Sequence, residues 1–382
     1  MERQEVRAAP PSCTVLFSQG CQTRPERALC SPTPSLRSVF PHLRLPVLTC
    51  AAALLIVGAA GVLHGCRRAP DLGVTVGSDH RIAIACIPKA TAHSYWQAAH
   101  DGVLRAAKEL NVRIEWQGPL DDSKVADQIG IFNNLAASGV DAMLLAPCDD
   151  KALLPHVRNA MKRGIPVGIF DSPLAGKLGR DYVDFIATDN RKAGALAAQT
   201  LIQAINSTKK KTTDASYEGR VIMVRFTEGS ASTRQREEAF KDVVAEGVTL
   251  RLVEQQFTDG STAGAQHVAE TLLDSYVKNN KLEIDGIFAS NQPTTEGTYN
   301  AIQALRDKGV QVRTRFVGFD DSNLLLQGLK SGTIDALIVQ DPGKMAYLGV
   351  KSLVNHLEKK PVEPAVDTGT SVMTKADLRI PQ

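Results

Sequence analysis

Short apolar segments alternate with amphipathic segments along most of this chain, beginning at Arg81. After RIAIACI at 81–87, residues such as Trp96, Ala99 and Val103 recur at helical spacing on one face. Strands of a parallel sheet that is covered on both faces read as apolar runs separated by helices. The alternation therefore predicts an α/β fold. We expect strands at 81–87, 112–116, 142–146, 166–170, 220–224, 249–253, 286–289, 316–318 and 336–339, with helices at about 96–110, 123–137 and 151–163.

The series of strand and helix units occurs twice, on either side of a connector that contains FIATDN at 185–190. The roughly 300 residues that follow position 80 exceed the size of one comfortable hydrophobic core. We therefore expect two doubly wound parallel-sheet lobes with a cleft between them. The polar loop at 207–219 carries Lys209–Lys211, which we interpret as solvated side chains rather than a docking patch.

The first 65 residues have the composition of an export signal. A basic stretch precedes the uncharged segment 45–63, and small residues then lead to Cys66. The tetrapeptide LHGC resembles a bacterial lipobox, whose cysteine receives a lipid, although His64 stands where a small residue is usual. An uncleaved membrane helix and plain secretion are the alternatives, and all three place the remaining chain outside the cytoplasm. We expect residues 1–65 to contain this signal, preceded by an N-terminal extension that a start codon assigned too early would explain. We expect residues 66–79 to be a tether.

The chain from Cys66 onward is electrically neutral. Residues 1–65 hold six arginines and three acidic residues, whereas 66–382 hold 38 basic and 38 acidic side chains. A neutral protein lacks the electrostatic attraction on which nucleic-acid binding depends. Beyond Cys66 the sequence has two cysteines, Cys86 and Cys148, at the ends of neighbouring expected strands. We favour two buried thiols over a disulfide.

Ligands of doubly wound sheets bind beyond the carboxyl ends of the strands. The residues at those ends include two aromatics, several carboxylates, amides and arginines. This mixture suits a sugar, because an aromatic ring covers the apolar C–H face while carboxylate, amide and guanidinium groups pair with hydroxyls. The candidates are His93, Tyr95, Trp96, Asp171, Ser172, Arg234, Arg236, Asn291, Gln292, Asp320 and Gln340.

From about Arg81 to Ile380 the chain resembles the periplasmic sugar-binding proteins of the ribose and galactose type, which deliver sugars to ATP-driven (ABC) importers. The resemblance implies the periplasmic binding protein type I fold, a monosaccharide ligand and no cofactor. It rests on SYWQAAHDG, IPVGIFDS, IATDN, SASTRQREEAF, IFASNQPTTEG, FVGFDDS and ALIVQDP.

Matching these stretches position by position implies a ligand set. Tyr95 and Trp96 correspond to the aromatic pair that flanks the sugar, and Arg236 to the ligand arginine, whereas Arg234 has no such counterpart. The remaining polar matches are Asp171, Asn291, Asp320 and Gln340. Three positions differ from ribose binders, with His93 in place of Asn, Ser172 in place of Arg and Gln292 in place of Asp. Loss of the arginine would leave room, so we expect a sugar other than ribose.

The resemblance also implies how the protein works. Three hinge crossings near 187–189, 340–341 and 367–368 would join an N-terminal lobe of 80–188 plus 341–367 to a C-terminal lobe of 189–340 plus 368–382. The lobes close on the ligand, and the closed form is recognised by the membrane permease. A lipid on Cys66 would hold the protein at the membrane.

Three other classes of function are alternatives to transport. A sensory protein that presents the same closed state to a chemoreceptor or sensor kinase is the main alternative to transport. A sugar-responsive repressor is disfavoured, because no helix-turn-helix precedes Arg81. An enzyme is disfavoured as well, since the segment after the first strand, CIPKATAHSYW, has no phosphate-binding glycine loop, and the chain has neither a G-x-S-x-G turn nor a His and Cys cluster with metal-ligand spacing.

Overall fold

The computed structural model describes residues 81–207, 219–247 and 250–379. The expected signal, Cys66, the tether and Lys209–Lys211 lie outside the described residues. Among those described, no helix is both long and apolar enough to cross a membrane.

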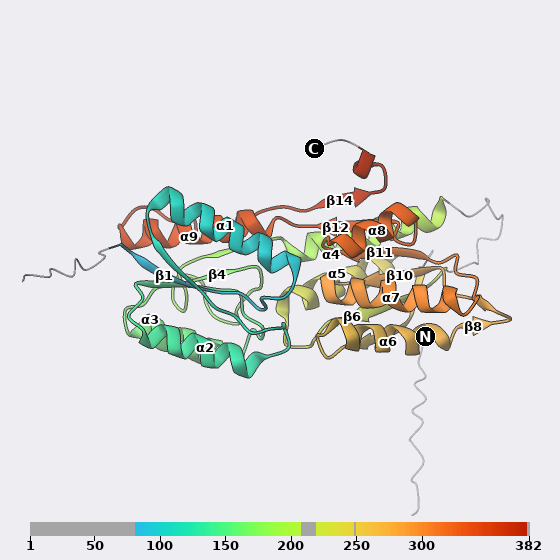
Figure 1. Ribbon diagram of the computed structural model, residues 1–382, viewed down its shortest axis with the longest axis horizontal. Coiled ribbons are helices and arrows are strands. Elements are labelled where there is room, and N and C mark those ends of the chain that lie inside the picture. The colour runs from blue at the N-terminus through green and yellow to red at the C-terminus, as the bar shows by residue number, and fades with distance from the viewer. Residues whose placement is uncertain (1–80, 208–218, 248–249, 380–382) are drawn as a thin grey trace, which may run out of the picture. The chain divides into compact units, whose positions relative to one another are not determined.

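Six parallel strands form the sheet of the first lobe, in the order β13-β5-β4-β3-β1-β2 (Figure 1). Helices α1 and α9 cover one face, where Trp96 and Met345 join Ile84 in a buried cluster. Helices α2 and α3 cover the other, through Phe132 and Val157. The elements are β1 (Ala83–Ile87), α1 (Ser94–Leu110), β2 (Arg113–Trp116), α2 (Val125–Ala137), β3 (Ala142–Leu145), α3 (Leu154–Lys162), β4 (Val167–Phe170), β5 (Phe185–Ala187), α9 (Pro342–Leu357) and β13 (Ala365–Asp367).

The second lobe repeats this plan, with the strand order β14-β12-β11-β10-β6-β7. Helices α4 and α5 cover one face, and α6, α7 and α8 cover the other. Only the edge strand β14 runs antiparallel to its neighbour. The elements are α4 (Asn190–Asn206), β6 (Gly219–Arg225), α5 (Ala231–Glu246), β7 (Leu250–Phe257), α6 (Thr262–Asp274), β10 (Gly286–Ala289), α7 (Gln292–Asp307), β11 (Arg315–Phe319), α8 (Asn323–Ser331), β12 (Ala336–Val339) and β14 (Ser371–Thr374), with a small hairpin of β8 (Val277–Lys278) and β9 (Lys281–Leu282) and the short 3-10 helix Asp377–Arg379.

The chain passes from one sheet to the other three times, after β5, after β12 and after β13. Two of these crossings are bonded side by side: the Thr368 N–H donates to the Ala187 carbonyl at 2.9 Å, and the Asp189 N–H donates to the Asp367 carboxylate at 3.1 Å. The predicted α/β class with parallel sheets is confirmed. The carboxyl ends of the strands in each sheet face the other lobe, and the site described below is built there.

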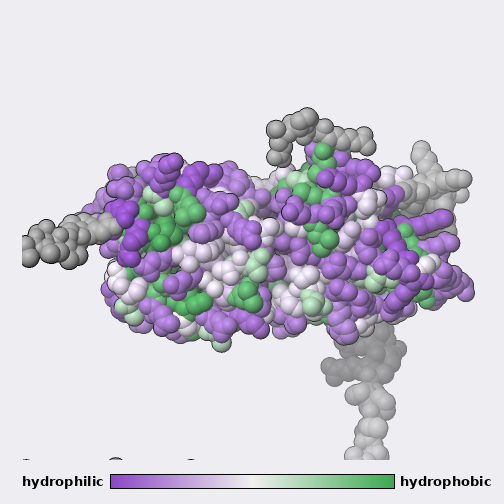
Figure 2. All heavy atoms as spheres, in the orientation of Figure 1, coloured by the Kyte–Doolittle hydropathy of each residue, from purple (hydrophilic) through white to green (hydrophobic). Residues whose placement is uncertain are grey.

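Cys86 and Cys148 are both buried free thiols. Burial raises the pKa of each, because the thiolate would lose its hydration. At the surface, apolar residues form small scattered patches among hydrophilic ones (Figure 2). Leu104 and Leu120 are the large apolar side chains of the described residues that remain exposed, and isolated ones of this kind are common on proteins.

Candidate ligand-binding site

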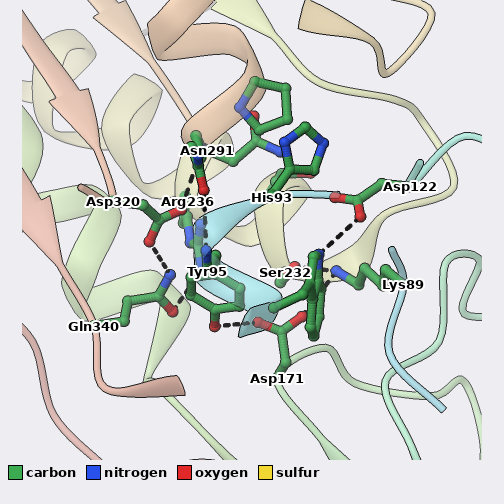
Figure 3. Close-up of a pocket in the computed structure, with 14 residues that line it drawn as sticks. Lys89, His93, Tyr95, Asp122, Asp171, Ser232, Arg236, Asn291, Asp320 and Gln340 are labelled. Carbon is green, nitrogen blue, oxygen red and sulfur yellow. Dashed lines mark hydrogen bonds and ion pairs between the residues drawn. The ribbon is translucent and has the colours of Figure 1, made fainter. Parts of the chain in front are cut away.

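A cavity lies where the carboxyl ends of the two sheets meet (Figure 3). Its volume is about 30 Å³. Polar side chains from both lobes form most of its wall. The lining residues are Lys89, His93, Tyr95, Trp96, Asp122, Asp171, Ser232, Thr233, Arg236, Asn291, Gln292, Pro293, Asp320 and Gln340.

Nine of the ten residues that the sequence predicts line this cavity, and Ser172 does not. The Ser172 hydroxyl accepts a hydrogen bond from the Ser232 N–H at 3.2 Å, so this side chain joins the two lobes. The Lys89 ammonium lies against Asp171, the residue that precedes Ser172 in the chain. Five lining residues were not predicted: Lys89, Asp122, Ser232, Thr233 and Pro293.

The aromatic pair stands at the start of α1. The Tyr95 hydroxyl donates to Asp171 at 2.6 Å, and the Trp96 indole N–H donates to Asp122 at 3.0 Å. The two rings meet edge to face with centroids 5.0 Å apart. Burial, followed by the negative charge of Asp171, raises the pKa of Tyr95, so its hydroxyl stays protonated and acts as a donor.

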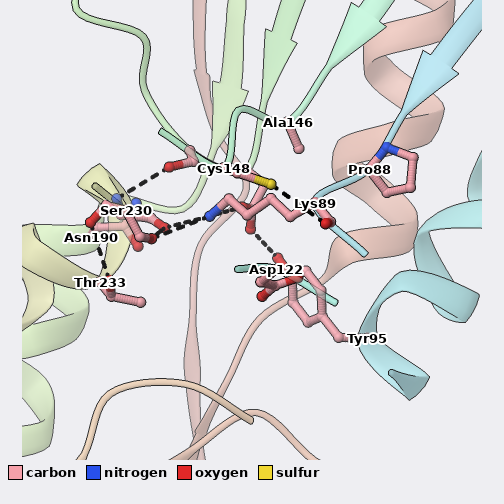
Figure 4. A network of polar contacts seen from close by, with 12 residues as sticks. Pro88, Lys89, Tyr95, Asp122, Ala146, Cys148, Asn190, Ser230 and Thr233 are labelled. Atoms are coloured by element: carbon pink, nitrogen blue, oxygen red, sulfur yellow. Dashed lines mark hydrogen bonds and ion pairs between the residues drawn. The ribbon is translucent and has the colours of Figure 1, made fainter. Parts of the chain in front are cut away.

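Lys89 follows β1 and places a buried cation in the cavity (Figure 4). Its ammonium lies 3.0 Å from the Asp171 carboxylate, and each side chain is 5% exposed. The same ammonium donates to the hydroxyls of Ser232 at 3.0 Å and Ser230 at 3.5 Å in the other lobe. Burial raises the pKa of nearby Asp122, while the charge of Lys89 opposes that shift. A lone lysine directly after an apolar strand was the signal in the sequence that could have revealed this group.

Arg236 on α5 organises the half of the site that the second lobe provides. Its guanidinium donates to the Asn190 side chain at 2.7 Å, to the Ser290 carbonyl at 3.0 Å and to the Gln340 side chain at 2.7 Å. It also lies 4.0 Å from the centre of the Phe319 ring. Because this rigid fork is held on several sides, its direction is fixed before any ligand arrives.

Gly194 on α4 permits the position of Arg236. A Cβ atom at this glycine would lie 2.1 Å from the Arg236 carbonyl oxygen, so the two helices approach more closely than any other residue allows. The first lobe has the same arrangement, where a Cβ at Gly102 on α1 would lie 2.0 Å from the Gly343 carbonyl oxygen on α9. Each lobe thus contains a helix pair whose close approach depends on a glycine.

Asp171 and Asp320 occupy equivalent places in the two lobes, directly after β4 and β11. Both have a φ of 63°, a left-handed conformation that is uncommon for residues other than glycine. Asp320 accepts hydrogen bonds from the Gln340 side chain at 2.7 Å and from the Gln292 N–H at 3.2 Å. Burial raises the pKa of Asp320 to about 6, and the charge of Arg236 works against that increase.

Three further predicted residues stand at helix N-termini. Asn291 is the N-cap of α7 and accepts from the Thr294 N–H at 3.3 Å. The Gln292 side chain crosses to the first lobe, where it accepts from the Tyr95 N–H at 3.3 Å. His93 is the N-cap of α1, and its buried Nε2 has no hydrogen-bond partner. An unpaired nitrogen of this kind is available to a ligand hydroxyl.

The wall of the site combines two cationic side chains, Lys89 and Arg236, with the three carboxylates of Asp122, Asp171 and Asp320. No group of three or more metal-ligating side chains occurs among the residues that the structure describes.

Comparison with known proteins identifies the family. Residues 84–361 match the periplasmic binding protein domain. The chain belongs to the periplasmic binding protein family. These are solute-binding proteins that work outside the cytoplasm, not enzymes.

Several relatives of this periplasmic binding protein carry names that refer to sugars. The D-ribose/D-allose-binding protein of Pseudomonas aeruginosa is 27% identical over 308 residues, which cover 78% of this chain and 90% of the relative. A carbohydrate transporter solute-binding protein from Agrobacterium radiobacter, solved with D-arabinose, is 32% identical with a TM-score of 0.71 and covers 79% of this chain and 97% of its own. An ABC transporter solute-binding protein from Agrobacterium vitis, solved with D-fucose, is 32% identical with a TM-score of 0.70, over 78% and 97%.

Proposed function

We propose that this protein is the extracytoplasmic sugar-binding component of an ABC importer. It binds a monosaccharide in the cleft between its lobes and presents the closed form to the permease. The observation that carries the proposal is the cavity itself, where an aromatic pair from one lobe faces a guanidinium and amide groups from the other. The names of its relatives, which refer to pentoses, hexoses and ABC transport, point the same way.

The polar and aromatic side chains have separate roles in binding a polyol. Asp171 and Asp320 accept hydrogen bonds from hydroxyls, and Arg236 donates to them, while Tyr95 and Trp96 cover the apolar face of the ring. Each of these groups is already paired with a neighbour in the closed structure. A sugar therefore replaces existing bonds with its own, and the ammonium of Lys89 moves aside from Asp171 or shares it with the ligand.

Movement about the three crossings opens and closes the site. Because ligand contacts come from both lobes, only the closed state uses all of them, and the sugar shifts the population toward closure. The side-chain hydroxyl of Thr368 is buried without a partner in one of these crossings. Such a group is easily accommodated when the hinge rotates, because rotation breaks no hydrogen bond of that hydroxyl.

A thermal-shift screen of pentoses, hexoses and polyols tests the function. A ligand at 100 times its dissociation constant adds about 2.7 kcal/mol to the free energy of unfolding, and Asp171→Asn and Arg236→Gln should abolish the shift. If no carbohydrate raises the melting temperature of the folded protein, the sugar-binding function is refuted.

We propose in addition that Cys66 is the lipidated first residue of the mature protein, with 67–79 as the tether to the membrane. Labelled fatty acid should be incorporated into the wild-type chain and not into Cys66→Ser. Equal labelling of both chains would contradict the anchor.

A further inference from the structure

Outside the cavity, a second set of bonds joins the two lobes at the rim of the cleft. It connects the loop after β3 in the first lobe with the loop before α5, and with Arg234 near the start of α5, in the second. The Arg234 guanidinium lies 2.7 Å from the Asp150 carboxylate, and the Asp150 N–H donates to the Gly229 carbonyl at 3.2 Å. The Arg234 side chain is 31% exposed and that of Asp150 is 11% exposed. Neither residue lines the cavity.

Both partners are held in place by their own lobes. The Arg234 guanidinium also donates to the Glu228 carbonyl at 2.7 Å, and the Asp150 carbonyl accepts from the Ala175 N–H at 2.9 Å. The loops are closely packed, since a Cβ atom at Gly229 would lie 2.3 Å from the Asp149 carboxylate. A bond between two groups that are already fixed loses little side-chain entropy when it forms, so it is stronger than a typical surface ion pair.

These rim bonds differ from the polar contacts that join the lobes inside the cavity. The bonds from Lys89 to Ser232 and from Tyr95 to Gln292 lie in the cavity, where a ligand takes their place. The Asp150 and Arg234 pair lies outside it and is compatible with either an empty or an occupied site. Opening of the hinge separates the two loops, because they belong to different sheets.

We propose that Asp150 and Arg234 form a latch that stabilises the closed state independently of the ligand. A protein whose binding-competent form is only partly populated has an apparent Kd equal to the intrinsic value divided by that population. The latch therefore lowers the apparent Kd of every ligand by the same factor. The residues that line the cavity determine which sugar is preferred. This inference rests on the proposed closure of the two lobes around a ligand.

Hydrogen exchange of the ligand-free protein measures the latch directly. The Asp150 amide reports on the rim, and the Tyr95 amide, bonded across the lobes to Gln292, reports on the cavity. We expect Arg234→Gln and Asp150→Asn each to speed exchange at both positions by three- to tenfold, and the exchanged pair Asp150→Arg with Arg234→Asp to restore protection. Faster exchange at the rim alone would mean local loosening of one loop and would overturn the proposal.

A matched control is available within the second lobe. Arg191 lies 2.6 Å from Asp242, an ion pair that does not cross between the lobes, so Arg191→Gln should leave both amides unchanged. If sugars from the screen bind, the two latch variants should weaken all of them by the same three- to tenfold factor. Unequal weakening would show that the pair acts on the ligand. Unchanged exchange in the latch variants would refute the latch whether or not any sugar binds.

Discussion

Replacement of Lys89 by methionine removes the cation beside Asp171 and keeps most of the apolar side chain. The two charged groups are 3.0 Å apart and almost fully buried. At an effective dielectric constant of about 20, their attraction amounts to about 5 kcal/mol. Removal of one partner from a buried pair costs roughly 3–5 kcal/mol, because the other charge stays behind without compensation. We expect Lys89→Met to lower the free energy of unfolding by about 3 kcal/mol at pH 7.5.

Urea unfolding followed by tryptophan fluorescence measures this loss. Asp171→Asn combined with Lys89→Met should recover at least half of it, because the double variant contains neither charge. The loss should become smaller as the pH is lowered, since burial raises the pKa of nearby Asp122 and a proton on its carboxyl group removes one of the negative charges around Lys89. A loss below about 1 kcal/mol that simply adds to the effect of Asp171→Asn would refute the assigned role of Lys89.

Other substitutions test the remaining parts of the structure. Burial raises the pKa of Asp184 to about 6, so the folded state binds this proton more tightly than the unfolded state does. This carboxyl group should therefore raise the free energy of unfolding by about 2–3 kcal/mol as the pH falls from 7.5 to 4. Urea unfolding of Asp184→Asn should lack this increase. Sugar binding should weaken about tenfold between pH 7.5 and 5 by calorimetry, because protonation of Asp320 removes an acceptor, and a pH-independent Kd would contradict its role. Gly194→Ala and Gly102→Ala should each lower the free energy of unfolding by about 1–3 kcal/mol. Gly194→Ala should also displace Arg236 and weaken binding at least tenfold, whereas Gly102→Ala should change Kd little.

The central strands of both sheets could be predicted because burial on two faces leaves an uninterrupted apolar run. Residues 142–146 and 286–289, for example, match β3 and β10 closely. The edge strands β13 and β14 were missed, since their residues are largely exposed and carry no such pattern. Their place in the sheet depends on backbone pairing with β5 and β12, which local sequence does not encode.

The candidate site was predictable where the rule about strand ends applied and not where a residue meets a partner far along the chain. Asp171 directly follows β4, and Tyr95 lies in the first turn of the helix that comes after β1. In the sequence, Lys89 has the features of a surface lysine, because its partner Asp171 lies 82 positions further along the chain. Asp122 belongs to a polar loop whose sequence does not differ from that of an ordinary surface loop. Ser172 stands at the predicted strand end but does not line the cavity. Its hydroxyl accepts a hydrogen bond from the Ser232 N–H of the second lobe instead.

The left-handed aspartates at the ends of β4 and β11 have a consequence for the orientation of a ligand. Since the two sheets share one strand order, these carboxylates form a pseudo-symmetric pair and by themselves cannot tell one end of a sugar from the other. The helices that follow β1 and β6 make the two halves different. Helix α1 carries Tyr95 and Trp96 in its first turn, whereas α5 carries Arg236. In the proposed site, a ligand would meet the aromatic pair and Lys89 beside Asp171, and Arg236 and amide groups beside Asp320. This difference between the two halves of the duplicated fold would set which way round the molecule lies.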